Sequence, residues 1–385
     1  MKLYKIRQRR PANDEKFRRI AVKATTLFFI HAFFAASLLF PTTASAQGSI
    51  RSGGQDLNLT NDLPPGSPSG SGALAADYRE QMRALIIKIS RFTRRVNKDF
   101  IVMTRGGLEL MEKVSGGEED AARSAATTYI RSIDGVLLHN LFFRPPSADA
   151  EAGQTDATVR EKNLRLAKLG QENGLQIWVT DFATNEDTAK KSYELNETNG
   201  FIPFTVEKSG RSFDRIPAYP ARPISENSNS IIRLKSARNF LFMNNPSRFD
   251  TQDEMVEALR TTNFDALVLD VFDRTQNPFT KKNVRKLQLK KIGSRRLVLA
   301  VMNISTADSS HYYWKPGWTI GNPRFIGSPA PGTPDRHLTQ YWDRAWHDIL
   351  TGKPDSYVYG IAKQGFDGVV LDGVENFRQY ESADR

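Results

Sequence analysis

The chain has 385 residues, of which 39% are apolar and 25% are charged, and it contains no cysteine. The apolar content is enough for one large domain or two ordinary ones, and the lack of cysteine excludes disulfides, thiolate metal ligands and a cysteine nucleophile. The formal net charge is +11, but residues 1–46 hold nine Lys/Arg and two Asp/Glu and therefore carry +7 of it. A basic nucleic-acid groove is therefore not expected in the remaining chain.

Residues 1–46 have the three parts of a secretory signal peptide. A basic stretch ending "FRRIAVKATT" precedes the apolar run "LFFIHAFFAASLLF" and then "TTASAQ", where Ala44 and Ala46 satisfy a small-x-small cleavage rule. We expect export to the periplasm or the extracellular space, without stable membrane association after cleavage. Arg18-Arg19 leaves the twin-arginine route open. An uncleaved anchor is the alternative, although 14 apolar residues are short for a membrane span.

Residues 47–75 are rich in Gly, Ser and Pro, which predicts a disordered linker. The pattern then becomes helical. Apolar residues recur at spacings of three and four from Met82 to Val96, which predicts a helix over 76–97 with one apolar stripe. We expect residues 76–385 to form a single domain.

Eight apolar, strand-like runs follow, and helical segments lie between several of them. The runs are 100–104, 133–139, 175–181, 201–207, 239–245, 264–270, 296–303 and 366–372. Such an alternation predicts an α/β fold with an all-parallel sheet, and eight strands close as a (β/α)₈ TIM barrel. The alternative, an open doubly wound sheet, normally has a Gly-rich phosphate turn after its first strand, and "TRGGLEL" is not one.

Helix starts are recognisable between the strands, at Thr251 with Glu254 and at Thr280. The order of the elements is unusual, because the domain begins with a helix and ends soon after a strand. Eight strands need eight outer helices, and we expect only seven between strands. The helix at 76–97 is therefore predicted to complete the ring beside the strand at 366–372.

Barrel enzymes have their sites at the carboxyl ends of the strands, so the polar residues that end the runs form the candidate site. They are Thr104 and Arg105, His139 and Asn140, Asp181, Glu207, Asn244 and Asn245, Asp270, Asn303 with Asp308, and Asp372 with Glu375. Each could be only a cap or a turn residue. Aspartate is nevertheless a poor strand residue, and "WVTD", "LVLD" and "VVLD" each end an apolar run with one. Asp265 and Asp367 start their strands and are expected to be turn and cap residues.

A segment rich in aromatic residues follows the seventh run. Trp314 and Trp318 could stack on sugar rings or pack the loop, whereas Trp342 and Trp346, four residues apart, are expected to pack a helix. Carboxylates on a barrel rim beside aromatic residues favour glycoside chemistry, in which one acid donates a proton and another stabilises an oxocarbenium-like centre. The five histidines show no metal-ligand spacing and no phosphate-binding loop is present, so we expect neither a metal nor a cofactor.

Several segments resemble a known family. "LVLAVMNISTADSSHYYWKPGW", "QYWDRAWHDIL" and "GFDGVVLDGVENF" resemble, in this order, the middle of the secreted TIM-barrel family that includes the endo-α-1,4-polygalactosaminidases, formerly grouped with cysteinyl-tRNA synthetase relatives. "IDGVLLHNLFF", "QIWVTDFA" and "GFIPFTVEKSGRSFD" resemble the C-terminal half of that family. The two halves are in swapped order, so the resemblance, which covers 78–380, implies a circularly permuted barrel.

The resemblance implies a glycoside hydrolase that acts on a galactosamine-containing polysaccharide. The catalytic aspartate of the family corresponds to Asp372, and its glutamate corresponds to His139 of "HNLFF". We therefore expect Asp372, Asp270 and His139 to be catalytic, because a histidine can donate a proton near neutral pH. The substrate would be bound by Asp181, Asn303, Asp308, Trp314, Trp318, Asn244, Arg105 and Glu375. The alternative is a catalytically inactive barrel that only binds carbohydrate, since the glutamate is replaced.

Overall fold

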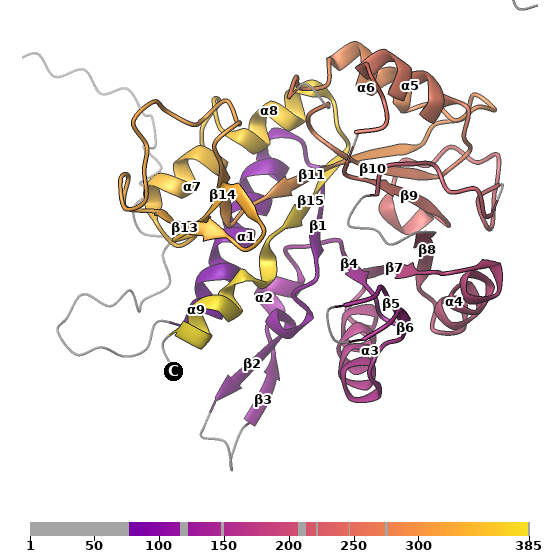
Figure 1. Cartoon of the computed structure of the whole chain (residues 1–385), viewed down its shortest axis with the longest axis horizontal. Coiled ribbons are helices and arrows are strands. Elements are labelled where there is room, and N and C mark those ends of the chain that lie inside the picture. The colour runs from indigo at the N-terminus through magenta and orange to yellow at the C-terminus, as the bar shows by residue number, and fades with distance from the viewer. Residues whose placement is uncertain are drawn as a thin grey trace, which may run out of the picture. The chain divides into compact units, whose positions relative to one another are not determined.

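Eight parallel strands form the centre of the structure (Figure 1). The computed structural model describes residues 77–115, 122–147, 150–206, 213–220, 222–245, 247–273 and 276–383. The eight strands are β1 (Ile101–Arg105), β4 (Gly135–His139), β7 (Gln176–Phe182), β8 (Ile202–Val206), β9 (Phe240–Met243), β10 (Ala266–Asp270), β11 (Leu297–Asn303) and β15 (Gly368–Asp372). All eight strands predicted from the apolar runs are confirmed. The predicted signal peptide (1–46) and linker (47–75) lie outside the described residues.

The strand order shows how the sheet is wound. It is β8-β7-β4-β1-β15-β11-β10-β9, so neighbours in the sheet follow one another along the chain, and the last strand, β15, pairs with the first, β1. A doubly wound sheet would instead reverse direction at its first strand. β8 and β9 are the two ends of this order, and the rings of Phe204 and Phe240 lie 5.6 Å apart between them. The sheet is thus a nearly closed, TIM-like barrel.

The strand register identifies the inward face. Residues paired across neighbouring parallel strands share one face of a sheet. Trp178 on β7 stacks on Phe240 on β9, with ring centroids 4.5 Å apart, although β8 lies between the two strands. Only side chains inside a barrel can meet in this way. Following the pairs from these two residues, the inward residues at or next to the carboxyl ends are Arg105, His139, Thr180, Phe242, Asp270, Asn303 and Asp372.

Helices surround the sheet. They are α1 (Tyr78–Val96), α2 (Thr127–Ile130), α3 (Ala157–Glu172), α4 (Glu186–Thr198), α5 (Gln252–Arg260), α6 (Lys281–Leu287), α7 (Arg344–Leu350), α8 (Tyr357–Gln364) and α9 (Phe377–Ala383). Two predicted helix starts are confirmed, because the hydroxyl of Thr251 accepts from the Glu254 N–H at 3.1 Å and that of Thr280 accepts from the Asn283 N–H at 3.1 Å. Each cap satisfies an N–H that would otherwise have no partner within the helix.

The connection from β8 to β9 differs from the expectation of a helix between every pair of strands. Within residues 213–220 and 222–239 the chain forms only a short 3₁₀ turn, η2 (Leu234–Ser236). Pro217, Pro220 and Pro223 lie in this connection. Proline lacks the N–H that a helix interior needs and clashes with the preceding turn, which explains why no α-helix forms there.

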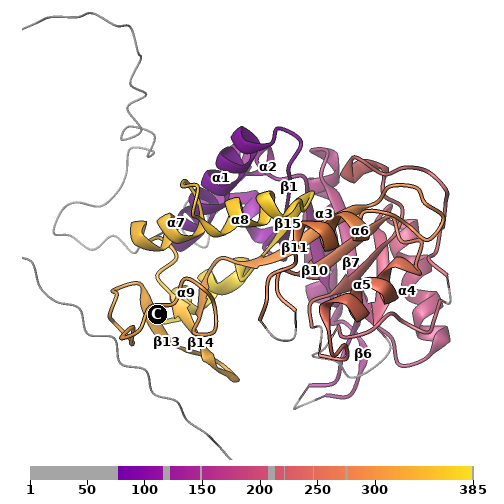
Figure 2. The same ribbon diagram turned by 90° about the horizontal axis from the view of Figure 1, so that it is seen from above.

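The helix α1 completes the outer layer at the junction of the first and last strands. It packs against α2, α8 and α9, and α8 and α9 are the α-helices that precede and follow β15 (Figure 1 and Figure 2). Its apolar stripe is fully buried from Met82 to Ile89 and becomes exposed toward Val96, and Arg79 forms an ion pair with Glu381 of α9 at 2.7 Å. The predicted position of this helix beside the last strand is therefore confirmed.

Smaller antiparallel sheets lie outside the barrel sheet. They are the hairpins β2 (Glu112–Ser115) with β3 (Ala122–Ala125) and β5 (Phe143–Arg144) with β6 (Gly153–Gln154), and the antiparallel sheet of β12 (Thr306–Asp308), β14 (Thr333–Thr339) and β13 (Ile326–Ala330). Short 3₁₀ turns, η1 (Leu108–Met111) and η3 (Val374–Asn376), follow β1 and β15. Trp346 of α7 is fully buried and its indole N–H donates to the Ile304 carbonyl at 2.8 Å, as the packing prediction for this residue requires.

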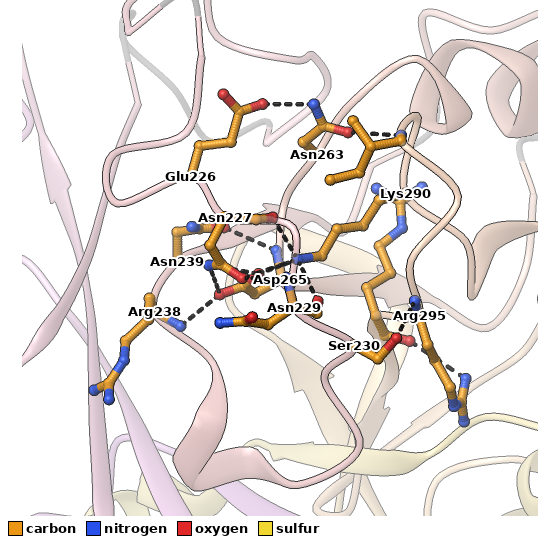
Figure 3. Close-up of polar contacts among 12 residues, drawn as sticks. Glu226, Asn227, Asn229, Ser230, Arg238, Asn239, Asn263, Asp265, Lys290 and Arg295 are labelled. Atoms are coloured by element: carbon orange, nitrogen blue, oxygen red, sulfur yellow. Dashed lines mark hydrogen bonds and ion pairs between the residues drawn. The ribbon is translucent and has the colours of Figure 1, made fainter.

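Aspartates at the amino ends of three strands have a structural role. The carboxylates of Asp134, Asp265 and Asp367 each accept a backbone N–H at or just before the start of a neighbouring strand, at 2.8–2.9 Å. Each also pairs with a cation, and their partners are Arg94, Lys290 and Arg295, respectively. The Asp265 and Lys290 side chains are fully buried, and Asn227 and Asn239 surround them (Figure 3). The prediction that Asp265 and Asp367 are turn and cap residues is supported.

Candidate functional site

The carboxyl end of the barrel is the accessible end of its interior. In β1, β4, β8, β10, β11 and β15 the last residue is half-buried, whereas all the residues before it are buried. Apart from the buried Thr180, the inward-facing polar residues identified from the register are therefore held on rigid strands and reach the surface together. We call this end the rim.

An ion pair lies at the rim. Arg105 at the end of β1 donates from Nη1 to Oδ2 of Asp372 at the end of β15, at 3.2 Å, and the two side chains are 24% and 25% exposed. The Arg105 guanidinium carbon also lies 5.4 Å from the ring centroid of Phe242 on β9. Since β9 is four strands away from β1 in the sheet order, Arg105 spans the end of the barrel and places a permanent positive charge at its centre.

His139 lies beside this pair and is held at both ring nitrogens. Nε2 accepts from Nε of Arg105, and Nδ1 faces the hydroxyl of Thr180 on β7. Burial, together with the charge of Arg105, lowers the pKa of His139 well below its usual value. The ring is therefore neutral, with its proton on Nδ1. The structure does not support the proton-donor role expected for His139, and instead gives it the role of positioning Arg105.

Asp270, at the end of β10, lies in a different environment. Burial raises the pKa of its carboxyl group to about 6, and the nearby charge of Asp308 adds to this effect. A hydrogen bond from the Phe272 N–H to Oδ1, at 3.0 Å, and the charge of Arg336 act in the opposite direction. Such a carboxylic acid holds its proton close to neutral pH, which is the property of a general acid.

Asp308 contrasts with Asp270 although the two groups influence each other. Burial alone would raise the pKa of Asp308, but hydrogen bonds from Ser310, at 2.6 and 2.9 Å, and from Arg336, at 3.0 Å, outweigh it and lower the pKa. Asp308 thus stays ionised to a lower pH than an ordinary aspartate does, whereas Asp270 keeps its proton to a higher pH. Such divided environments are typical of acid–base sites.

Three other predicted residues lie at the rim or in the loops around it, and two of them have a clear structural role. Oδ1 of Asn303 accepts the N–H groups of Ser305 and Thr306, at 3.0 and 2.8 Å, and so caps the turn after β11. Oε1 of Glu375 accepts the Gly107 N–H at 3.1 Å, which ties the loop after β1 to the turn after β15. Gly107 has φ +77°, a conformation that favours glycine. Asn244 directly follows β9 and is half-buried.

The structure places Asp181 away from the rim. It is fully buried, and its neighbour Thr180 takes the inward position, so Asp181 faces the outer helices. Its Oδ1 accepts the N–H groups of Phe142 and Phe143, and its Oδ2 accepts from Ser192 and Asn196 of α4. Asp181 therefore fastens α4 and the loop after β4 to the barrel, and the substrate-binding role expected from the sequence has no support in this geometry.

Replacing Asp181 separates its structural role from a role at the site. We expect Asp181→Ala to lower the free energy of unfolding by about 2–4 kcal/mol, because several buried donors lose their acceptor. Urea denaturation measures this loss. Any activity per folded molecule should stay within about twofold of the original, because the side chain faces away from the rim. A stable variant with reduced activity would contradict the outward placement.

The two predicted loop tryptophans pack with each other. The rings of Trp314 and Trp318 lie 5.4 Å apart, and their further ring contacts are with His337 of β14 and with Phe325 beside β13. Both rings remain half-buried. The packing interpretation explains these contacts, and stacking on a sugar stays a prediction.

Five residues of the site were not predicted from the sequence. Thr180, Phe242 and Phe213 contact His139 or Arg105, and Arg336 and Tyr357 lie near Asp270 or Asp308. Thr180 and Phe242 could have been found from the alternation of inward and outward residues once the register was known. Of the other three, Phe213 lies in a loop, Arg336 lies on the largely exposed strand β14 and Tyr357 starts α8, and no inward-facing pattern marks them in the sequence.

The raised pKa of Asp270 makes a prediction about stability. Between the ordinary aspartate pKa of 3.8 and about 6, the folded state binds this proton more tightly than the unfolded state does, so the contribution of Asp270 to stability falls as pH rises through this window. Asp270→Asn removes the titration and can keep the hydrogen bond from Phe272. Its free energy of unfolding relative to the original protein should therefore increase by about 1–3 kcal/mol from pH 4 to pH 7. Urea denaturation at both pH values tests this, and a difference independent of pH would contradict the assignment.

Two further features are absent from the described part of the chain. No group of three or more His, Asp or Glu side chains there could hold a metal ion. Likewise, no helix within these ranges has the length and apolarity that crossing a membrane requires.

The chain is similar to proteins that have no assigned function. It is 28% identical over 127 residues to an uncharacterized protein of Deinococcus radiodurans, a match that covers 33% of this chain and 38% of that protein. It is 27% identical over 175 residues to one of Methanocaldococcus jannaschii, with 44% and 48% covered. A third, of Thermotoga maritima, is 30% identical over 82 residues, with 21% and 24% covered. The chain thus spans less than half the length of each relative, and no known family's sequence profile matches it.

Proposed function

We propose that this protein hydrolyses glycosidic bonds at the rim of its barrel and that its substrate is a galactosamine-containing polysaccharide. The observation that carries the proposal is the pair of inward-facing carboxyl groups with opposed environments. Asp372 is paired with Arg105, and burial raises the pKa of Asp270 to about 6. The sequence resemblance to the polygalactosaminidase family supports the substrate class and the role of Asp372.

In this proposal the two acids divide the chemistry. Asp270 donates its proton to the glycosidic oxygen, and the bond from that oxygen to the anomeric carbon breaks. The carboxylate of Asp372 stabilises the positive charge that develops on the sugar ring. Water then adds to the anomeric carbon and gives its proton to the Asp270 carboxylate, which restores the acid. Arg105, held by His139, keeps Asp372 oriented and provides the permanent charge beside it.

We also propose that the barrel is circularly permuted relative to the family. In a permuted chain the two halves occur in swapped order, so an alignment can follow only one half at a time. The partial matches, which cover 21–44% of this chain, are consistent with this. The position of α1 beside α8 and α9 supports the proposal as well, because it is the helix that a cut between the last strand and its helix would leave at the N-terminus.

Export remains part of the proposal on sequence grounds, because residues 1–46 have the organisation of a signal peptide. Intact-mass measurement of the protein recovered outside the cytoplasm should give a chain that begins near Gln47. Recovery of the full-length chain would reject cleavage.

The activity is tested by incubating the purified protein with a galactosamine polymer and measuring new reducing ends over time. We expect their number to increase in proportion to the enzyme concentration. The expected rate falls as pH rises above about 6, because Asp270 then loses its proton. If no reducing ends form from this or any related amino-sugar polymer, hydrolysis is rejected.

A second candidate function is carbohydrate binding without cleavage. The observation in its favour is that the position of the family's glutamate is occupied by His139, whose two nitrogens are engaged by Arg105 and Thr180. Retention of the protein on immobilised galactosamine polymer, without release of reducing ends, would decide for this alternative.

A further inference from the structure

A basic hollow lies on the outside of the barrel, between α1 and α2. It has a volume of about 540 Å³ and is lined by Ile87, Ser90, Arg91, Arg94, Arg95, Thr128, Arg131 and Ser132. Four of the eight lining residues are arginines and none is acidic. Because α1 leads directly into the start of β1, this part of α1 lies at the amino end of the barrel, opposite the rim. The hollow is therefore separate from the carboxylate site.

One arginine of the hollow is held in place by the fold. Arg94 donates from Nη2 to both carboxylate oxygens of Asp134, at 3.1 Å each, and that carboxylate also accepts the Val102 N–H of β1. Ser90 and Ser132 lie at the base of the hollow, and their hydroxyls donate hydrogen bonds to the backbone carbonyls of Ser132 and Tyr129, respectively. The hollow thus has a rigid base with one oriented guanidinium group.

The other three arginines have no anionic partner within the described ranges. Arg91, Arg95 and Arg131 are exposed and none of them takes part in the ion pairs there. Like charges four residues apart on a helix, as Arg91 and Arg95 are, destabilise it slightly. The helix dipole favours basic residues only in the last turn, where Arg94 and Arg95 lie. It does not explain Arg91, one turn earlier, or Arg131 from the neighbouring segment.

We propose that this hollow binds a soluble oligoanion that carries phosphate or sulfate groups. Guanidinium groups match the oxygen geometry of these anions with two parallel hydrogen bonds, and the hydroxyl of Thr128 adds a donor at the edge. The volume is typical of a site for a ligand of many atoms, so several anionic groups on one molecule can be bound together. A single inorganic anion would leave most of the arginines uncompensated.

The proposal is tested by titrating the purified protein with tripolyphosphate and with a sulfated, heparin-derived hexasaccharide, using calorimetry at low and moderate salt. We expect binding that weakens with salt. The triple variant Arg91→Gln/Arg95→Gln/Arg131→Gln should bind at least about tenfold more weakly. The control variant Lys281→Gln/Lys282→Gln/Arg285→Gln removes the same charge from exposed positions on α6 and should stay within about threefold.

Three outcomes would overturn the proposal. They are no binding of either probe by the original protein, an equal loss of affinity in the two triple variants, and binding only to vesicles that contain phosphatidylglycerol, which would identify a membrane surface instead. If the triple variant does not fold, the single variants Arg91→Gln and Arg131→Gln replace it, and each should weaken binding measurably.

Discussion

Replacing Asp372 by asparagine should abolish cleavage of the galactosamine polymer. Asparagine has nearly the same shape but no negative charge, so Asp372→Asn loses the stabilisation of the positive charge in the transition state and the ion pair with Arg105. We expect the rate of reducing-end formation to fall at least about 10²-fold. Thermal unfolding should change little, because the side chain is one quarter exposed and a partly exposed ion pair contributes at most about 1 kcal/mol.

A matched control for this variant is Asp348→Asn on α7. Asp348 pairs with Lys353 at 2.9 Å on the surface, where the two side chains are 37% and 52% exposed, respectively. The control removes one carboxylate charge from the protein but leaves the rim intact, so its rate should be unchanged. An Asp372→Asn protein that cleaves the polymer as fast as the control would show that Asp372 has only a structural role.

The largest loss of stability should come from Lys290→Met. Lys290 and Asp265 form a fully buried ion pair, with Nζ 2.6 Å from Oδ1 (Figure 3). Lys290 also donates to the backbone carbonyls of Asn227 and Asn229, at 3.1 and 3.0 Å. Methionine fills a similar volume but leaves a buried carboxylate and two carbonyls without this partner. We expect the free energy of unfolding to decrease by about 3–5 kcal/mol, as measured by urea denaturation.

Two further variants make this measurement specific. Lys286→Met on α6 removes a lysine that forms a loose ion pair, at 3.4 Å, with the exposed Glu257, and it should cost less than about 1 kcal/mol. The double variant Asp265→Asn/Lys290→Met removes both charges and should recover part of the loss, because no unpaired charge then remains buried. A loss in Lys290→Met no larger than that in Lys286→Met would show that the buried pair is not important for stability.

The barrel could be predicted from the sequence because its strands are buried on both faces. Each strand appears as an apolar run, and each start or end differs from the prediction by at most two residues. The position of α1 could also be predicted, because the outer face of the sheet between the last and the first strand needs a helix to cover it. The absence of an α-helix from 213–220 and 222–239, between β8 and β9, could have been recognised from Pro217, Pro220 and Pro223.

The site was harder to predict because three aspartates end their apolar runs in the sequence in the same way. "WVTD", "LVLD" and "VVLD" look equivalent in sequence, but side chains alternate between the two faces of a strand. A difference of one residue in strand register decides which face a side chain takes. Asp181 therefore lies against α4, whereas Asp270 and Asp372 lie inside the barrel. Register depends on pairing with the neighbouring strands, which a single strand's sequence does not contain.

The environments of the acids depend on residues that are distant in the sequence. The partner of Asp372 is Arg105, 267 positions away, and the pKa of Asp270 is raised mainly by burial. Neither effect is visible in a local motif. For the same reason, the sequence suggested His139 as an acid, while burial, together with the charge of Arg105, lowers its pKa well below the usual value and leaves it neutral.

The most direct test of the proposed site is a crystal structure of the Asp372→Asn protein soaked with a galactosamine oligosaccharide. The variant should keep the ligand intact. Our account predicts that the oligosaccharide lies across the rim, with a glycosidic oxygen within hydrogen-bonding distance of Asp270 and an anomeric carbon facing position 372. An oligosaccharide bound elsewhere on the molecule, with the rim unoccupied, would contradict it.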